Sequence, residues 1–278
     1  MPTVTQPAPP PQPPETPHRT DPALRRLLAA LVAIFALVGV ASGAMALLGL
    51  VSRDVETVHA TYRGVKSVQL DTGSGDVSIV QGATGTPVRV RARITRSFST
   101  PERADSVSGG VLTLGADCRS WFGDCGVDYD ITVPPGTRVD ADVGSGDVRL
   151  TGLRTRSPLV VRGGSGDLDL RDVSAPAVDL RVGSGNIVAD LRRSPLVSVE
   201  LGSGDLALAL GGTPKRVRAS TGSGDIELMV PAAPSYRIDT DTGSGDVTAD
   251  EALVHDDRSP RLLSVSTGSG DVDLRAGP

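Results

Sequence analysis

The chain is poor in aromatic residues, histidine and cysteine. Phe, Trp and Tyr together make up 3% of its 278 residues. A core with so few rings must be built from Val, Leu, Ile and Ala, which suit thin, regularly stacked layers better than an irregular globule. The three histidines, His18, His59 and His255, lie far apart and accompany no metal-ligand spacing or nucleophile motif. The sequence therefore predicts no cofactor, no metal site and no catalytic residues.

An excess of charge of one sign is also missing. The chain carries 28 Lys and Arg residues against 33 Asp and Glu residues. Nucleic-acid binding proteins usually show a basic excess or a basic patch. We therefore expect no nucleic acid among the partners.

Proline is abundant, but it is concentrated at the N-terminus. Residues 1–22 hold nine of the 21 prolines and few apolar side chains. Such a segment favours extended, solvated backbone. We expect residues 1–26 to form a disordered, Pro-rich tail.

The one long apolar run extends from Leu27 to Val51 without a charged residue. As a helix it would be about 37 Å long, and a bilayer core needs about 30 Å. Arg25 and Arg26 precede the run, while Asp54 and Glu56 follow it closely. The positive-inside rule then predicts one transmembrane helix over 27–51, a cytoplasmic N-terminus and an extracytoplasmic C-terminal part. The alternative is a signal peptide cleaved after the small residues at 44–46.

After a short linker, predicted over 52–66, the chain repeats one corner motif through residues 67–278. The sequence Gly-Ser-Gly-Asp occurs seven times, and an eighth copy ends in Asn. From the second copy onward the successive spacings are 20, 19, 19, 20, 21 and 25 residues. The first Gly and the last residue of the copies are Gly73 and Asp76, Gly144 and Asp147, Gly164 and Asp167, Gly183 and Asn186, Gly202 and Asp205, Gly222 and Asp225, Gly243 and Asp246, and Gly268 and Asp271. A period of this length indicates an array of stacked units.

Apolar and polar residues alternate on both sides of each corner. Ahead of the second corner, Val139, Ala141 and Val143 are separated by Asp140 and Asp142. After every Asp or Asn, the first and third residues are again apolar: Val148/Leu150, Leu168/Leu170, Ile187/Ala189, Leu206/Leu208, Ile226/Leu228, Val247/Ala249 and Val272/Leu274. Strict period-two alternation indicates strands with one buried face. We predict an all-β, β-solenoid-like stack of about 20-residue units, with a β-sandwich of hairpins as the alternative.

The corner residues suit a structural turn. Gly accepts positive φ and leaves room for the corners above and below, and Asp accepts backbone N–H groups in turns. A ladder of aspartates also suggests calcium binding. However, calcium-binding repeats follow a nine-residue period, and Asn186 replaces one carboxylate. We therefore interpret the corners as structural.

The stretch between Asp76 and Gly144 contains no such corner. Alternating residues over 88–94, 111–114 and 129–133 still predict strands there. The stretch also holds Cys118 and Cys125, the only two cysteines. Two thiols seven positions apart in an exported chain predict a disulfide.

The corners and the segment Tyr129–Gly136, which reads Tyr-Asp-Ile-Thr-Val-Pro-Pro-Gly, resemble a bacterial family called "putative adhesins", β-strand-repeat domains of unknown function. The resemblance covers about residues 65–275. It implies a non-enzymatic protein of the cell envelope. It brings no catalytic residues.

The sequence leads to three hypotheses on function. The first is a membrane-anchored module that binds an envelope protein or glycan, or mediates adhesion. The second is an envelope-stress sensor or regulator, and the remote third is a carbohydrate-active enzyme that uses two carboxylates. Because no helix follows the last repeat, we also expect self-association or partner docking at an open C-terminal strand edge near residues 263–274.

Overall fold

A computed structural model of the chain describes residue 39 and residues 54–96, 101–117, 125–233 and 235–277. The chain divides into two units, Met1–Leu48 and Gly49–Pro278, and all described strands belong to the second. The predicted tail and most of the predicted transmembrane helix lie outside the described residues. In the part of the chain that the structure describes, no helix is long and apolar enough to span a bilayer.

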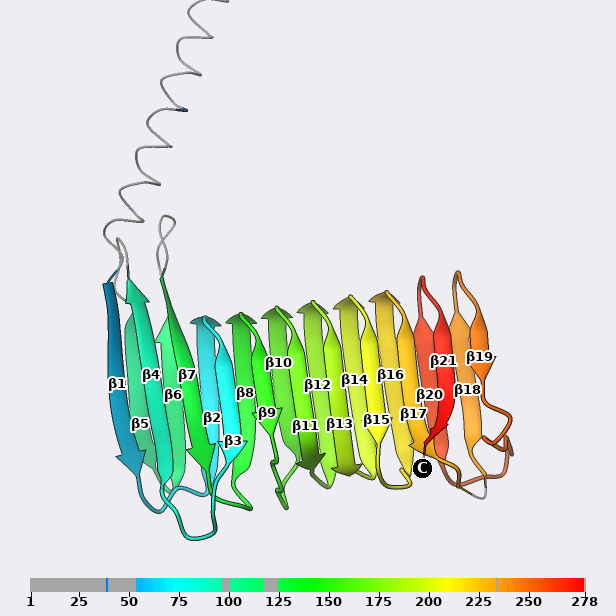
Figure 1. The fold of residues 1–278 in the computed structure, drawn as a ribbon, viewed down its shortest axis with the longest axis horizontal. Helices are drawn as coiled ribbons and strands as arrows, with labels where there is room; N and C mark the ends of the chain where they lie inside the picture. Colours follow the sequence, from blue (N-terminus) through cyan, green and yellow to red (C-terminus); the bar gives the residue numbers. More distant parts are fainter. Residues whose placement is uncertain (1–38, 40–53, 97–100, 118–124, 234, 278) are drawn as a thin grey trace, which may run out of the picture. The chain divides into compact units, whose positions relative to one another are not determined.

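The described residues form two β-sheets with 21 strands in total (Figure 1). The first sheet has the order β1 (Asp54–Tyr62), β4 (Val88–Arg96), β7 (Cys125–Val133), β3 (Val77–Gln81), β9 (Val148–Thr151), β11 (Leu168–Ser174), β13 (Ile187–Arg193), β15 (Leu206–Leu210), β17 (Ile226–Pro231), β21 (Val272–Gly277) and β19 (Val247–Ala249). The second sheet has the order β18 (Arg237–Thr242), β20 (Leu262–Thr267), β16 (Arg216–Ser223), β14 (Leu196–Ser203), β12 (Ala177–Ser184), β10 (Leu159–Ser165), β8 (Arg138–Ser145), β2 (Ser67–Ser74), β6 (Val111–Asp117) and β5 (Glu102–Ser108).

Each repeat forms one coil: a strand of the second sheet, a corner and a strand of the first sheet. Equivalent strands of neighbouring coils pair in parallel, so that Leu180 lies between Val161 and Val199. In the other sheet Ala189 lies between Leu170 and Leu208 in the same way. This is the stacked arrangement that the repeat predicts, and it differs from an antiparallel sandwich of hairpins.

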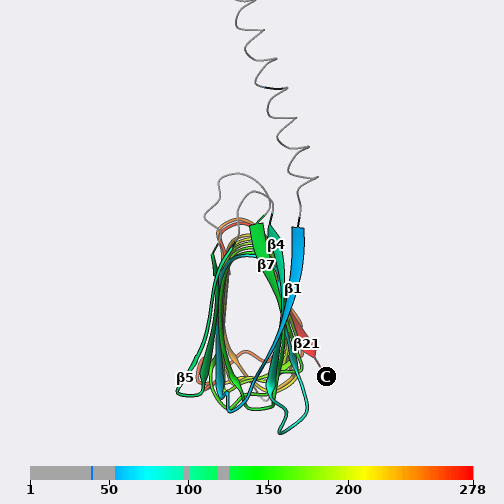
Figure 2. The ribbon, with the colours of Figure 1, turned by 90° about the vertical axis from the view of Figure 1, so that its left-hand side faces the viewer.

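The core is a thin layer between the two sheets (Figure 2). Every second side chain of each internal coil points into it, as the alternation predicts; Leu150, Leu180 and Leu228 are fully buried. The predicted strands between Asp76 and Gly144 are present as β4, β6 and β7. Tyr129 on β7 is the largest side chain of this part of the core.

The N-terminal end of the stack corrects one domain boundary. Residues 52–66, predicted as a linker, contain β1, which pairs antiparallel with β4 along its whole length. β4 in turn pairs antiparallel with β7, and β5 pairs antiparallel with β6. The segment therefore belongs to the β-domain. β1 is an edge strand, and its side chains are exposed or half-buried along its whole length, so the alternation of buried residues is weaker there.

The C-terminal end corrects the predicted edge. The last coil in the sequence, β20–β21, does not end the stack: it lies between β16–β17 and β18–β19, as Figure 1 shows by colour. β20 pairs with both β16 and β18, and β21 pairs with both β17 and β19. The prediction of an open edge at residues 263–274 is therefore wrong. Val247 and Ala249, predicted to be buried, are exposed because their coil is the outermost one.

Candidate functional site: the corner ridge and its grooves

The eight corners lie side by side and form a straight ridge along one edge of the stack. In each corner the second Gly has positive φ, from 121° at Gly166 to 136° at Gly245. That φ lies in a region that L-residues avoid. The corner therefore requires glycine for its backbone conformation.

Close stacking is a second reason for glycine. A Cβ on Gly146 would lie 2.2 Å from the carbonyl oxygen of Gly75 in the neighbouring corner. A Cβ on the first Gly of the same corner, Gly144, would lie 2.5 Å from the carbonyl oxygen of Gly73. Neither contact is sterically allowed. The short distance between coils thus requires glycine at both positions of the motif.

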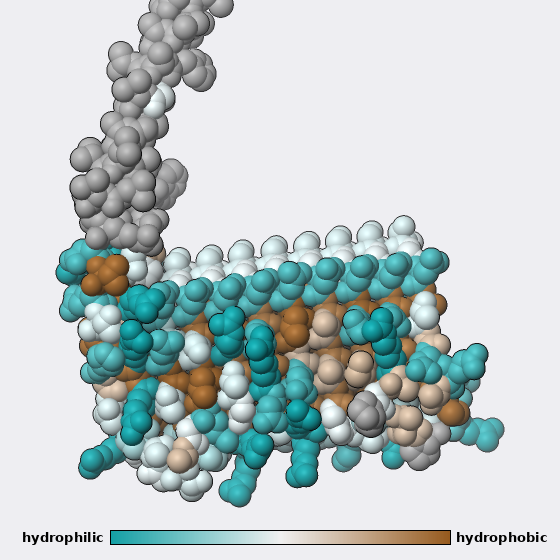
Figure 3. All heavy atoms as spheres, viewed as in Figure 1, coloured by the Kyte–Doolittle hydropathy of each residue, from teal (hydrophilic) through white to brown (hydrophobic). Residues whose placement is uncertain are grey.

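The corner aspartates form a ladder of hydrogen bonds from coil to coil. The backbone N–H of Asp147 donates to Oδ1 of Asp76 at 2.9 Å, and the N–H of Asp167 donates to Oδ1 of Asp147 at 2.9 Å. The same contact continues through Asn186, Asp205, Asp225, Asp271 and Asp246 at 2.8–3.0 Å. The ladder follows the spatial order of the coils, so Asp271 precedes Asp246. Figure 3 shows a continuous hydrophilic row along the length of the stack.

Asn186 fits the ladder because its amide oxygen replaces the carboxylate oxygen. Its N–H donates to Asp167 Oδ1 at 2.8 Å, and its own Oδ1 accepts the N–H of Asp205 at 3.0 Å. Each corner thus needs an acceptor oxygen rather than a negative charge. This geometry gives the corner residues a structural role.

Asp128 starts the ladder and was missed by sequence reasoning. Its Oδ1 accepts the N–H of Asp76 at 3.0 Å, although no Gly-Ser-Gly precedes it. The signal was present, because Asp128 stands one residue before the buried Tyr129, just as every corner Asp stands one residue before an apolar residue of the strand that follows. Tyr129 pairs with Val77, the residue that directly follows the first corner, so Asp128 lies at the position equivalent to Asp76.

Tyr129 also belongs to a polar cluster at the N-terminal end of the core. Arg103 and Asp105 on β5 form an ion pair there, with side chains only 18% exposed. Burial raises the pKa of the Tyr129 phenol, Asp105 raises it further, and the hydrogen bond to Arg103 opposes them. The phenol is therefore neutral at physiological pH and joins the two sheets through Arg103.

The predicted disulfide lies only partly within the described residues. Cys125 is the first residue of β7, while Cys118 lies outside the described residues. The pairing of the two stays a prediction. In the described part of the chain, no group of three or more His, Cys, Asp or Glu residues is arranged to hold a metal ion.

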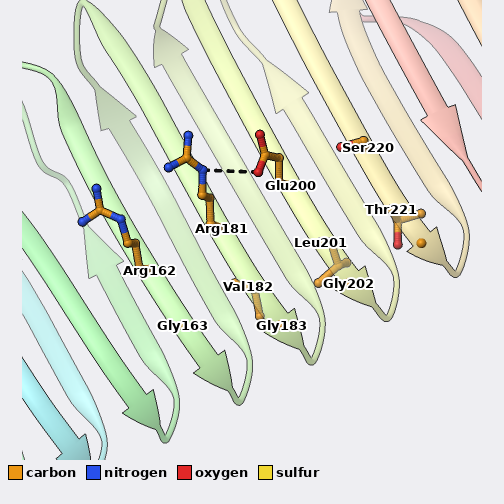
Figure 4. A pocket seen from close by; sticks show the side chains of 11 residues that line it. Arg162, Gly163, Arg181, Val182, Gly183, Glu200, Leu201, Gly202, Ser220 and Thr221 are labelled. Carbon is orange, nitrogen blue, oxygen red and sulfur yellow. Dashed lines mark ion pairs between the residues drawn. The ribbon is translucent and has the colours of Figure 1, made fainter.

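An open trough follows the ridge on the outer face of the second sheet (Figure 4). It crosses four coils and encloses about 540 Å³. The first glycines of the corners, Gly183, Gly202 and Gly222, form its floor, and the side chains of Arg162, Arg181, Glu200 and Ser220 line one side. The trough exists because a side chain at the floor positions would collide with the coil next to it.

Charges along the trough are largely paired between coils. Arg181 Nε lies 3.3 Å from Glu200, and Arg162 lies 3.7 Å from Asp140. On the first sheet, a second groove of about 280 Å³ lies between Arg149, Asp169 and the ladder. Exposed ion pairs of this kind contribute little to stability. Their alternation leaves the trough close to neutral, whereas the outer face of the first sheet also exposes apolar side chains such as Val188 and, in part, Met229.

Two solved bacterial proteins are similar to the chain. A "putative adhesin" from Bacteroides fragilis has 15% sequence identity and a TM-score of 0.50, and the match covers 80% of this chain and 97% of that chain. A "putative cell adhesion protein" from Clostridium sporogenes has 13% identity and a TM-score of 0.40, covering 81% of this chain and 100% of that chain. At this identity the likeness to the Bacteroides protein shows the fold alone. No curated protein matches the chain.

A family model covers almost all of the β-domain. The model described as Toastrack DUF4097 matches residues 49–276, which include β1 and every corner of the ridge. The boundary at residue 49 agrees with the observed role of β1 as part of the stack. The chain belongs to the Toastrack DUF4097 family of β-repeat domains of unknown function.

Proposed function

We propose that the protein is a non-catalytic, membrane-anchored binding module, which presents its β-repeat domain outside the cytoplasm and holds an elongated envelope ligand along the ridge. The anchor and the location rest on the apolar run at 27–51 and on the arginines before it. The name "putative adhesin" of the neighbour with similar fold agrees with a binding role.

The trough beside the ridge carries this proposal. It extends across four coils, is open to solvent along its length and has a floor of backbone without side chains. A linear glycan or an extended peptide fits such a surface, because successive units meet equivalent positions of successive coils. The near-neutral lining favours hydrogen bonds over attraction to a polyanion.

The experiment compares two pairs of arginines in the full-length protein. Arg162→Ala with Arg181→Ala alters the trough, whereas Arg149→Ala with Arg171→Ala alters the first sheet as a matched control. Intact cells are crosslinked, and the envelope material recovered with each protein is quantified. We expect recovery to fall about tenfold for the trough pair and to stay unchanged for the control pair.

Two results would overturn the proposal. Equal recovery with both pairs would exclude the trough as the binding site. Cleavage of envelope glycan by the purified protein, lost on replacing one pair of carboxylates, would show an enzyme. Recovery of a membrane-bound kinase as the sole partner would favour the stress-sensor hypothesis.

A further inference from the structure

The outermost coil, β18–β19, has an outer edge without a neighbouring strand. In the described part of the sheets β18 pairs only with β20, and β19 pairs only with β21. The N–H of Arg237 donates to the carbonyl of Arg261, the residue before β20, at 2.7 Å, and the N–H of Gly243 donates to that of Thr267 at the end of β20 at 3.0 Å. Because hydrogen bonding alternates along a strand, Thr240 and Thr242 direct their backbone groups away from β20.

A loop covers only the first part of this edge. The N–H of Tyr236 donates to Val254 O at 2.9 Å, and its carbonyl accepts the N–H of Asp256 at 2.9 Å. The N–H of Ile238 donates to His255 Nδ1 at 3.1 Å. The edge from Thr240 through the corner to Ala249, which we call the terminal rim, has no strand or loop paired to it among the described residues.

Apolar side chains remain exposed along the terminal rim. Val247 is 42% exposed, whereas Val272, at the equivalent position of the neighbouring coil, is 1% exposed. Ile238 is half-buried for the same reason. A further strand would cover these side chains and pair the free backbone groups.

The rim is acidic, unlike the middle of the stack. Asp239, Asp241 and Asp246 are exposed, and no ion pair to any of them is present within the described residues. Asp246 is also the last member of the ladder: its N–H donates to Asp271 Oδ1 at 2.8 Å, and among the described residues no further corner donates an N–H to its own Oδ1. In a two-fold dimer through this edge, antiparallel β18 strands would bring the carboxylates of the two copies together. Like charges on opposed strands disfavour such pairing.

We propose that the terminal rim binds an extended, basic segment of a partner protein as an added strand. The segment adds to the second sheet beside β18 and pairs its backbone with Thr240 and Thr242. Its alternate Lys or Arg side chains meet Asp239 and Asp241, and its apolar side chains cover the half-buried Ile238. Main-chain bonds supply affinity and the charges select the partner, as in other cases of strand addition. This surface is separate from the trough.

The probe is a blocked seven-residue peptide of alternating Lys and Val, and a peptide of alternating Glu and Val is its control. Binding to the full-length protein is measured by fluorescence anisotropy at low and high salt. We expect the Lys peptide to bind, with an affinity that falls with salt, and the Glu peptide not to bind.

Two variants test the two parts of the contact. Asp239→Asn with Asp241→Asn removes charge while keeping size, and Thr240→Pro removes an outward N–H. Each should lower the affinity about tenfold, whereas Glu102→Gln on β5, the edge strand at the other end, should leave it unchanged. Absence of binding, or equal binding by all variants, would overturn the proposal. A protein that dimerises in solution and becomes monomeric with Thr240→Pro would show that a second copy occupies the rim instead.

Discussion

At the scale of single residues, the repeated corner is a set of steric and hydrogen-bonding requirements. The second Gly of each motif has positive φ. In addition, a carbonyl oxygen of the neighbouring corner lies too close to the position that a Cβ would take. The Asp that follows supplies one acceptor oxygen to the next coil. Because the requirement is an oxygen and not a charge, Asn186 is accommodated without any change in the stack.

Gly146→Ala should destabilise the domain by about 3 kcal/mol or more, because the new Cβ adds a clash to the strained φ. Gly136→Ala is a matched control, since Gly136 also has positive φ, at 86°, but nothing lies within 4 Å of its Cβ position. The control should cost about 1 kcal/mol. Urea unfolding of both variants measures the difference, and equal losses would show that close stacking does not select glycine.

Asp147→Asn should change the free energy of unfolding by less than about 0.5 kcal/mol, because the amide oxygen still accepts the N–H of Asp167. Asp147→Ala removes the acceptor and should cost about 1 kcal/mol. Thermal melts with and without millimolar calcium check the interpretation. A melting temperature that rises strongly with calcium, and no longer does so in Asp147→Asn, would show that the ladder binds metal.

At the scale of strands, pairing on both sides distinguishes β20 from β18. β20 lies between β16 and β18, although it is the second-to-last strand in the sequence. The N–H groups of Leu262 and Gly268 donate to the carbonyls of Lys215 and Thr221, beside β16. Because every second residue of a strand directs its backbone groups to the same side, the N–H of Ser266 also faces β16. β18 has the same length but one free side.

Ser266→Pro should therefore destabilise the C-terminal coils by about 3 kcal/mol, since it removes a hydrogen bond inside a sheet. Thr240→Pro on β18 removes an outward N–H and should have a small effect, because proline is tolerated on edge strands. Hydrogen exchange of residues 216–231 reports the outcome. Equal protection in the two variants would contradict the inserted position of β20.

The connection between β6 and β7 carries the predicted disulfide. Mass spectrometry of non-reduced peptides should link Cys118 to Cys125, and closing so short a loop should contribute about 2–3 kcal/mol. Detection of two free thiols in protein taken from the cell surface would refute the pairing.

At the scale of the whole molecule, the two ends of the stack differ. The N-terminal end finishes in the antiparallel edge strands β1 and β5 and holds the partly buried ion pair of Arg103 and Asp105. The C-terminal end carries the terminal rim, with exposed apolar side chains and unpaired carboxylates. Between them, the trough on the second sheet has a near-neutral lining. Ligand contact along the faces and partner contact at the rim are therefore separate.

Protease added to intact cells without their outer wall layers should remove the β-domain and spare the Pro-rich tail, if the apolar run at 27–51 spans the membrane with its N-terminus inside. Antibodies against each part follow the digestion. Protection of the β-domain would contradict the proposed topology, and a mature chain that begins at Leu47 would show that the run is a cleaved signal.

The structure of a single coil follows from the amino-acid pattern alone. The spacing of the corners and the period-two alternation set the strands, their buried faces and the role of Gly and Asp, because these depend on contacts repeated in every unit. The order in which the coils stack depends instead on packing between coils. Corners at Gly243 and Gly268 have the same motif, so either could stack on Gly222, and β20–β21 occupies that place. Val247 is exposed because this order makes β18–β19 the outermost coil. β1 is a strand because it pairs with β4 at the other end of the sheet. Neither contact is encoded in the local pattern of apolar residues.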